Sequence, residues 1–356
     1  MRAFLVYDGG DSVYVPPTMG TPRADQMHGT PGEQLVEISG RVCYDSLGTG
    51  RNTPEYHKHL LGVKHYSVHE HVHFTVEVQD WMDPTPWIGI PDVVFRPMRS
   101  VARNRFTFNL RHALEWPTQL PPNLYNERVI KDWGRILQWA AHGVVPNLVP
   151  TPETRMPPSL EMRLVRPETD RECFVSLFLE DSLVWSHEQV RHRFNMSQRS
   201  GRFCDQTDRE YAIHPLLKKY LNEAGYMALN PEDGEQLFMQ PTVNDAAIHA
   251  RTRLGNDIGS LITQTKMVYE ATVDALQKYI GETMSVDATT ARKQARSAGR
   301  YYLGQGLSTE MIFTASVASW RGIFEKRVNP AADAAIHELM SQAKDCVLKS
   351  RYGQLF

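Results

Sequence analysis

The chain is poor in cysteine and has no long apolar segment. Its four cysteines are Cys43, Cys173, Cys204 and Cys346. They lie far apart and form no C-x-x-C pair, and the first eight residues run into acid and glycine without the apolar core of a signal peptide. No apolar run approaches the roughly 20 residues that a membrane-spanning helix needs. We therefore expect a cytoplasmic protein with reduced thiols and no membrane partner.

The chain also lacks an excess of charge of either sign. Its 39 Lys and Arg residues face 41 Asp and Glu residues, which gives a net charge of −2. No overall field attracts a nucleic acid polymer, so any phosphate site must be local. There is no internal repeat and no low-complexity tract. With 356 residues, 41% of them hydrophobic, the chain can bury a core in one large domain or two smaller ones.

Residues 191–202 concentrate positive charge in one short stretch. The cationic residues are Arg191, His192, Arg193, Arg199 and Arg202. Arginine pairs bidentately with phosphate or carboxylate, and the turn at Ser200-Gly201 lets backbone N–H groups approach the same oxygens. The stretch therefore predicts an anion site, and a nucleotide phosphate is its natural guest.

The helix expected before this stretch has a charged face. Glu188 lies three residues before Arg191 and four before His192, so the three side chains share one side of a helix. Such a face can orient a ring and its charge. A solvated network of ion pairs explains the same pattern without a ligand, but the adjoining Ser-Gly-Arg turn favours a binding site.

Apolar periodicity predicts a mixture of strands and helices. Strands are expected at residues 3–7, 71–78, 105–109 and 173–179. Helices are expected at about 33–44, 55–63, 110–116, 126–142, 182–192, 215–225, 243–280 and 287–302. The C-terminal third is expected to be mainly helical. Prolines and two tryptophan-centred turns within 80–170 indicate an inserted subdomain or cap.

The charged stretch carries a resemblance to a known family. It reads His187-Glu188-Gln189-Val190-Arg191-His192-Arg193, then Ser197-Gln198-Arg199-Ser200-Gly201-Arg202, and resembles the defining motif of the flavin-dependent thymidylate synthases. The family has seven residues between the second arginine and the serine, whereas this chain has six. The resemblance implies that Arg191, His192 and Arg193 contact a flavin. It implies that dUMP is bound by Glu188, Arg191, Gln198, Ser200, Gly201 and Arg202.

The N-terminal part also resembles this family. Its motif is a histidine, any residue, serine or threonine, two residues, glutamate and histidine, and His65, Ser67, Glu70 and His71 occupy those positions. The family binds flavin and folate here, so the resemblance implies flavin contacts at Ser67 and Glu70 and a catalytic His65 near the folate. A histidine at a helix end can donate to a pterin or flavin carbonyl, and a serine beside a glutamate can hold ribityl oxygens.

Three histidines in this region allow a zinc hypothesis. His69, His71 and His73 alternate, so they would share one face of a strand, and imidazole is a common zinc ligand. No cysteine or carboxylate elsewhere has a recognisable ligand spacing. We therefore expect core or interface histidines and no metal site.

The C-terminal part matches the family pattern without gaps from Arg300 to Ile336. In the family, the arginines at the positions of Arg300 and Arg327 reach dUMP, one of them from a neighbouring subunit. A guanidinium aimed at the uracil carbonyl oxygens stabilises the charge that develops there. The resemblance therefore implies that Arg300 and Arg327 bind dUMP, and that Arg202 and Arg327 are catalytic. Surface helix charges are the alternative interpretation.

Departures from the family pattern cluster in the same part. The usual Leu-Pro is Leu303-Gly304. The asparagine and arginine of a Thr-x-Asn-x-Arg run are Ser316 and Ala318, and a usual glutamate is Ala335. We keep Ser316 as an expected flavin contact.

The region expected as an insertion contains a copy of the missing run. It reads Thr107-Phe108-Asn109-Leu110-Arg111. We therefore expect Asn109 and Arg111 to supply part of the flavin or folate contact. A helix capped by Asn109 explains the same residues without any ligand.

The resemblance implies an α+β fold, with a thymidylate synthase-like sheet, packed helices and an inserted subdomain. It also implies a homotetramer whose sites form between subunits. We expect the N-terminal part of the catalytic domain at residues 1–78, an insertion or cap at 79–170, and the C-terminal part at 171–356. A helical insert is expected at about 205–285.

The implied reaction is methylation of dUMP at C5, with methylenetetrahydrofolate as carbon donor, FAD as flavin and NADPH as reductant. It needs no protein nucleophile, and Cys204, which follows the arginine-rich motif, is expected to be a packed thiol. One alternative is a hydroxymethylase, or a methylase of dCMP, because uracil and cytosine reverse the hydrogen-bonding groups at two positions. Another is a catalytically silent flavin- or nucleotide-binding homologue.

Overall fold

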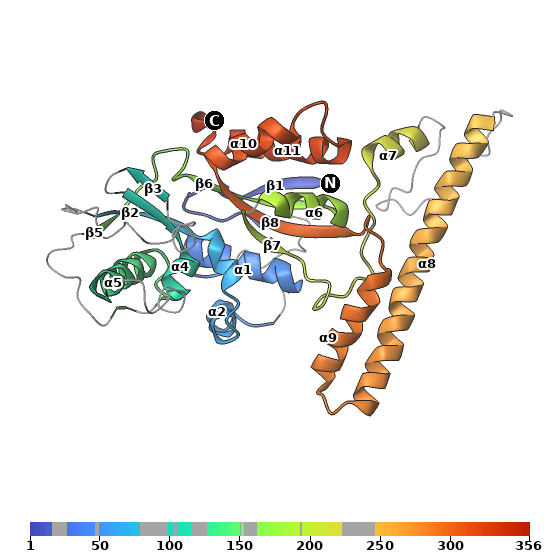
Figure 1. Ribbon diagram of the computed structural model, residues 1–356, viewed down its shortest axis with the longest axis horizontal. Helices are drawn as coiled ribbons and strands as arrows, with labels where there is room; N and C mark the ends of the chain where they lie inside the picture. The colour runs from blue at the N-terminus through green and yellow to red at the C-terminus, as the bar shows by residue number, and fades with distance from the viewer. Residues whose placement is uncertain are drawn as a thin grey trace.

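The protein is a mixed α+β structure with two four-stranded antiparallel sheets and packed helices (Figure 1). The computed structural model describes residues 1–15, 27–46, 50–78, 99–102, 105–115, 127–149, 151–152, 162–192, 194–222 and 246–356. No helix within these ranges is long and apolar enough to cross a membrane.

Sheet A has the strand order β1-β6-β8-β7, and every neighbouring pair is antiparallel. The strands are β1 (Arg2–Tyr7), β6 (Phe174–Ser182), β7 (Asn195–Gln198) and β8 (Ser308–Ser316). The strands expected at 3–7 and 173–179 are confirmed, but β7 and β8 were not predicted. Every residue of β8 is buried. A strand covered on both faces has no alternation of apolar and polar residues, so its pattern does not reveal it.

Helices cover both faces of sheet A. Leu177 and Phe313 belong to the core beneath α10 (Val317–Arg327) and α11 (Ala334–Lys349). Phe178 and Ile312 belong to the core that contains α1 (Pro31–Tyr44). Because neighbouring strand residues point to opposite faces, β6 and β8 each contribute to two cores. Figure 1 shows α10 and α11 on one side of the sheet and α1 on the other.

Sheet B has the strand order β3-β4-β2-β5. Its strands are β2 (His73–Val78), β3 (Arg99–Ala102), β4 (Arg105–Asn109) and β5 (Met162–Val165). The strands expected at 71–78 and 105–109 are confirmed. The stretch 79–170 thus shares a sheet with residues that precede it. The same sheet is flanked by α4 (Leu110–Glu115) and α5 (Glu127–Val144), which confirm the helices expected there.

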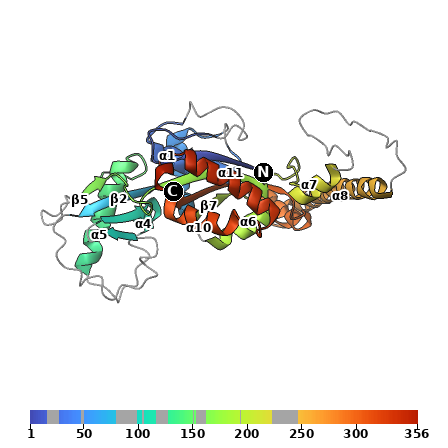
Figure 2. The same ribbon diagram turned by 90° about the horizontal axis from the view of Figure 1, so that it is seen from above.

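The remaining helices agree closely with the expected ranges. They are α2 (Thr53–Gly62), α6 (Leu183–Gln189), α7 (Pro215–Asn222), α8 (Ala246–Thr283) and α9 (Ala288–Gly299). Short 3-10 helices are η3 (Tyr66–His71), η6 (Val190–His192), η7 (Arg300–Tyr302) and η8 (Gly353–Leu355). The helices α8 and α9 lie side by side at the end of the molecule remote from sheet B (Figures 1 and 2).

A buried imidazole joins η3 to sheet A. One ring nitrogen of His71, Nδ1, lies 2.7 Å from Thr314 Oγ1, and the other, Nε2, lies 2.8 Å from Ser197 Oγ. The Thr314 hydroxyl donates in turn to Ser176 Oγ at 2.7 Å. Both nitrogens of His71 are therefore engaged by hydroxyl groups of the sheet, which gives this histidine a role in the core.

The buried histidines make stability depend on pH. Burial lowers the pKa of His69 and His71 to about 3 and that of His112 to about 4. In the unfolded chain the same imidazoles bind protons below about pH 6.5. The unfolded state therefore gains protons first, so stability is full above pH 6.5 and falls as the pH drops towards 4.

We expect the free energy of unfolding, measured with urea at pH 7.5 and pH 5, to show this loss. His69→Leu removes one of the depressed groups and should flatten the pH dependence. His249→Gln, which changes an exposed histidine on α8, should leave the dependence as it is. An undiminished slope in His69→Leu would contradict the assignment.

Candidate functional site

The charged loop that follows β7 is held in place by a buried arginine. The Arg199 side chain is 7% exposed and its guanidinium lies 2.6 Å from Asp45 Oδ2 and 3.6 Å from Glu310 Oε2. Its backbone N–H donates to the carbonyl of Glu310 at 2.9 Å. One residue thus ties the loop both to the end of α1 and to β8.

The next residues of the loop rest on the end of α1. The Ser200 N–H donates to the Cys43 carbonyl at 2.9 Å, and the Cys204 thiol donates to the same oxygen at 3.4 Å. The Ser200 hydroxyl accepts from the N–H of Arg202 at 3.3 Å and so closes a tight turn. Cys204 is 3% exposed, and burial raises its pKa to about 11. The expected packed thiol is therefore confirmed.

The other side of the loop is held by α9. Arg296 donates to the Phe203 carbonyl at 2.7 Å and to Asp205 Oδ2 at 2.6 Å. One helical turn further on, the Arg300 Cδ lies 3.5 Å from where a Cβ on Gly201 would stand. The structure thus brings Gly201, Arg202 and Arg300 together, as their shared predicted role requires.

Two of these arginines have no acidic partner among the residues that the structure describes. Arg202 and Arg300 are exposed, and within the described ranges neither guanidinium forms an ion pair, in contrast with the neighbouring Arg199 and Arg296. Two unpaired guanidinium groups beside a Ser-Gly turn are suited to bind a doubly charged anion.

A second group of predicted residues meets at the end of α6. Arg327, on the last turn of α10, donates to His192 Nε2 at 3.2 Å and to Glu188 Oε2 at 3.4 Å. Arg191 lies 3.2 Å from the other oxygen of Glu188. Burial, then the charge of Arg327, lowers the pKa of His192, so its imidazole is neutral and can accept from that arginine. One carboxylate here faces two guanidinium groups, which leaves the cluster positively charged.

The expected folate residue contacts the charged loop through aromatic rings. Nδ1 of His65 lies 3.3 Å from the Tyr44 hydroxyl, and the two rings meet edge to face. Tyr44 also meets Phe203 edge to face, with 5.0 Å between ring centres. Burial, then the charge of His59, lowers the pKa of His65. His65 is therefore a neutral, half-buried imidazole linked to the loop of Arg202.

The second Thr-x-Asn-x-Arg run, at residues 107–111, contacts the N-terminal motif through its arginine. Arg111 forms ion pairs with Glu70, on η3, and with Glu115 at 2.6 Å. Two predicted flavin residues, Glu70 and Arg111, are thus direct partners, and Ser67 lies half-buried on the same short helix as Glu70. The charge of Arg111 is matched by two carboxylates, so its contact positions Glu70.

Asn109 caps the helix that follows it. Its side-chain oxygen accepts from the N–H of His112 at 3.3 Å, and its own N–H donates to His112 Nδ1 at 3.4 Å. Asn109→Ala should lower the free energy of unfolding by about 1 kcal/mol, whereas Asn109→Asp keeps the accepting oxygen and should lose less. If Asn109 also contacts flavin, the alanine variant should bind FAD more weakly in a fluorescence titration. Unchanged FAD affinity would limit Asn109 to the cap.

The sequence comparison decides the family. The model of the family described as "thymidylate synthase complementing protein" matches residues 173–350, which is half of the chain. The chain belongs to this family. A search of curated proteins found no match. Members of this family, the flavin-dependent thymidylate synthases, are enzymes that use FAD and bind dUMP.

The matched part of this thymidylate synthase family member contains both arginine clusters. No hydrogen bond or ion pair between described residues joins Arg327 to Arg202 or Arg300. Gln198 lies between the clusters, and its amide donates to Ser186 Oγ at 3.1 Å and Thr309 Oγ1 at 3.2 Å. Arg193 lies outside the described residues.

Ser316 departs from the thymidylate synthase pattern and has a structural role. It is 1% exposed, accepts from the Ser319 N–H at 3.3 Å as the N-cap of α10, and donates to the Ser319 hydroxyl at 2.9 Å.

The sequence did not reveal the ion pairs that hold the loop, which involve Arg199, Asp45, Glu310 and Arg296. Arg199 was recognised only as one charge among five, because its partners lie far away in the sequence.

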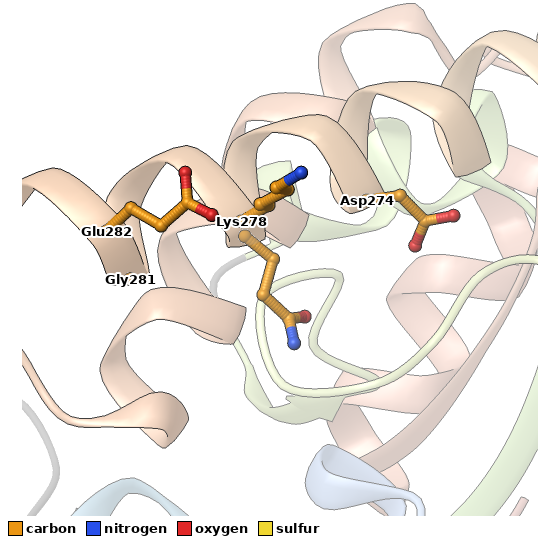
Figure 3. Close-up of a pocket in the computed structure, with 5 residues that line it drawn as sticks. Asp274, Lys278, Gly281 and Glu282 are labelled. Carbon is orange, nitrogen blue, oxygen red and sulfur yellow. The ribbon is translucent and has the colours of Figure 1, made fainter.

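A shallow hollow on α8 lies apart from these residues (Figure 3). It is lined by Asp274, Gln277, Lys278, Gly281 and Glu282, all from one helix. A single helix cannot enclose a nucleotide or a flavin, and none of the predicted site residues reaches it. Within the described ranges, no group of three or more His, Cys, Asp or Glu residues is arranged to hold a metal ion.

Proposed function

We propose that this protein is a flavin-dependent thymidylate synthase. In this proposal it methylates dUMP at C5, takes the one-carbon unit from methylenetetrahydrofolate, and uses FAD and NADPH. One observation carries the proposal beyond family membership. The turn of Ser200 and Gly201 lies beside the unpaired guanidinium groups of Arg202 and Arg300, on a loop fixed from two sides.

The proposed dUMP phosphate binds at this turn. A nucleoside monophosphate carries up to two negative charges near neutral pH, and two arginines can pair with them. Arg199 and Arg296 hold the loop by ion pairs of their own, so Arg202 and Arg300 do not have to be ordered by the ligand. Glu188, Gln198 and Arg191 are the other residues that we assign to the nucleotide.

We assign the flavin to donor groups at the end of α6 and to a second set on η3, β4 and α4. The proposed contacts are Arg191, His192, Arg193, Ser67, Glu70, Asn109, Arg111 and Ser316. The Arg191 side chain is 71% exposed, and the cluster around Glu188 has an excess of positive charge. Such a cluster favours the phosphates or the carbonyl edge of a flavin. FAD, when bound, supplies the reducing electrons of the reaction. The protein's residues bind, orient and provide charge.

Arg327 and His65 complete the proposed catalytic set with Arg202. Arg327 would stabilise the negative charge that grows on the uracil carbonyl oxygens, and Glu188 and His192 hold it in place. His65 would donate to, or accept from, the pterin as a neutral imidazole. Because no contact between described residues joins Arg327 to Arg202, we propose that the complete site forms between subunits of a homotetramer.

Product mass tests the proposal. Purified protein is incubated without oxygen with FAD, NADPH, methylenetetrahydrofolate and equal amounts of dUMP and dCMP, and the nucleotides are analysed by mass spectrometry. We expect a methyl-sized gain on dUMP. A hydroxymethyl gain, or a gain on dCMP, would replace the proposed reaction by a related one, and no gain on either nucleotide would favour a silent binder. An Arg327→Ala sample is the control for contaminating activity.

A further inference from the structure

The long helix α8 has an apolar stripe that faces solvent. Leu254, Leu261 and Val268 follow one another at intervals of seven residues and are 39%, 60% and 45% exposed. Ala275 continues the same interval and is exposed, and Tyr279 follows it at 58% exposure. Seven residues are close to two helical turns, so these side chains lie along one side of the helix. We call these five residues the α8 stripe.

The stripe is separate from the face by which α8 joins its own chain. That face contains Tyr269 and Val273, which pack with Ala295 of α9. Gly299 of α9 approaches the same two side chains so closely that an added Cβ would lie 2.8 Å from Val273. Within the described residues the stripe therefore remains open although α9 is already docked. An exposed apolar row at coiled-coil spacing indicates a helix-sized partner.

The charged residues beside the stripe, Asp257 and Lys278, favour a second copy of the same helix as that partner. Asp257 precedes Met267 by ten residues, and Lys278 follows Val268 by ten. A two-fold axis between residues 267 and 268 therefore brings Asp257 of each helix close to Lys278 of the other. A parallel pair in register would instead place aspartate beside aspartate and lysine beside lysine. Within the described part of one chain, Asp257 forms a single long ion pair, 3.9 Å from Arg253, with both side chains largely exposed.

We propose that the α8 stripe packs antiparallel against the α8 stripe of a second copy of this chain. The axis passes near Val268, the row of apolar residues forms the seam, and Asp257 and Lys278 form two equivalent ion pairs at its edges. This inference does not depend on the proposed reaction. It names a contact surface for an assembly, and it holds or fails whether or not the protein methylates a nucleotide.

Matched variants of the full chain test the surface. Leu261→Glu places a charge on the stripe, whereas Gln277→Glu places one on the same helix at an exposed residue on the side opposite the stripe. We expect the mass measured by sedimentation velocity to fall by half in Leu261→Glu and to stay at the wild-type value in Gln277→Glu. Helix content by circular dichroism should match in both. Equal masses in the two variants, whether both retained or both reduced, would overturn the proposal.

Cysteine cross-linking tests the direction of the pair. Val268→Cys lies at the proposed axis, so mild oxidation should link two chains through that residue. Leu254→Cys lies about 40 Å from its copy in an antiparallel pair, at 1.5 Å per residue, and should not link to itself. Wild-type protein controls for the four native cysteines, of which Cys43, Cys173 and Cys204 are buried. Self-linking by both variants would indicate a parallel pair and would overturn the proposed arrangement.

Discussion

Arg202→Ala is expected to weaken dUMP binding about 100-fold, because hydrogen bonds to a charged group contribute up to about 3 kcal/mol. Arg202 has no ion pair with a described residue, and its neighbour Arg300 cannot replace it because that guanidinium is assigned to the same phosphate. The fold should be unaffected, since Arg202 is exposed and only its backbone N–H closes the turn. Isothermal titration of dUMP into the variant measures the effect.

The control for this variant is Arg292→Ala. Arg292 is an exposed arginine of α9, and Arg300 is the residue that follows the same helix. Arg292 has no proposed role in binding the nucleotide. It should bind dUMP with wild-type affinity. The absorbance spectrum of bound flavin should be the same in both variants, because neither Arg202 nor Arg292 is a proposed flavin contact. Wild-type dUMP affinity in Arg202→Ala would remove the phosphate from this turn.

Arg199→Ala is expected to destabilise the protein by about 3 kcal/mol, as is typical when one member of a buried ion pair is removed. Glu310, whose side chain is 9% exposed, would keep Arg209, at 3.0 Å, as its one ion-pair partner among the described residues. The loop of Ser200 to Arg202 would also lose one of its ties to the end of α1, the contact between Arg199 and Asp45. We therefore expect weaker dUMP binding together with a lower free energy of unfolding in urea.

Asp45→Asn is the matched comparison, because it changes the other carboxylate that Arg199 contacts. The Asp45 side chain is 50% exposed, so its loss should cost less than about 1 kcal/mol. Asparagine also tolerates the left-handed backbone that Asp45 adopts, with φ of 48°. If Arg199→Ala and Asp45→Asn lowered the free energy of unfolding equally, the burial of the side chains would not determine the strength of the Arg199 ion pairs.

Most of the helices and the alternating strands could be predicted from the sequence, but α10 and α11 are not among the expected helices. The start of α1, for example, is marked by Pro31 in the first turn and by Thr30 and Glu33, which form a capping box in the structure. The strand β8 could not be predicted, because it is buried on both faces and so shows no alternation of apolar and polar residues. The strands β3 and β5 are four residues each, which is too short for a periodic signal.

The site could be predicted as a set of residue types but not as an arrangement. The motif from Glu188 to Arg202 identified the residues that now form two clusters. Which arginines are free to bind a ligand depends on partners elsewhere: Asp45 and Glu310 pair with Arg199, and Asp205 pairs with Arg296. Sequence spacing carries no information about such contacts between distant segments, so Arg199 and Arg202 looked alike.

The contact of His71 with Ser197 and Thr314 of sheet A determines which fragments of the chain can be expressed alone. The half of the chain that the family model matches contains β6, β7 and β8, yet β1 supplies the neighbouring edge strand, α1 covers one face, and His71 engages the Ser197 and Thr314 hydroxyls inside it. A fragment limited to residues 173–350 would expose an unpaired, apolar strand edge and would aggregate. Chimaeras between relatives should therefore exchange both halves together.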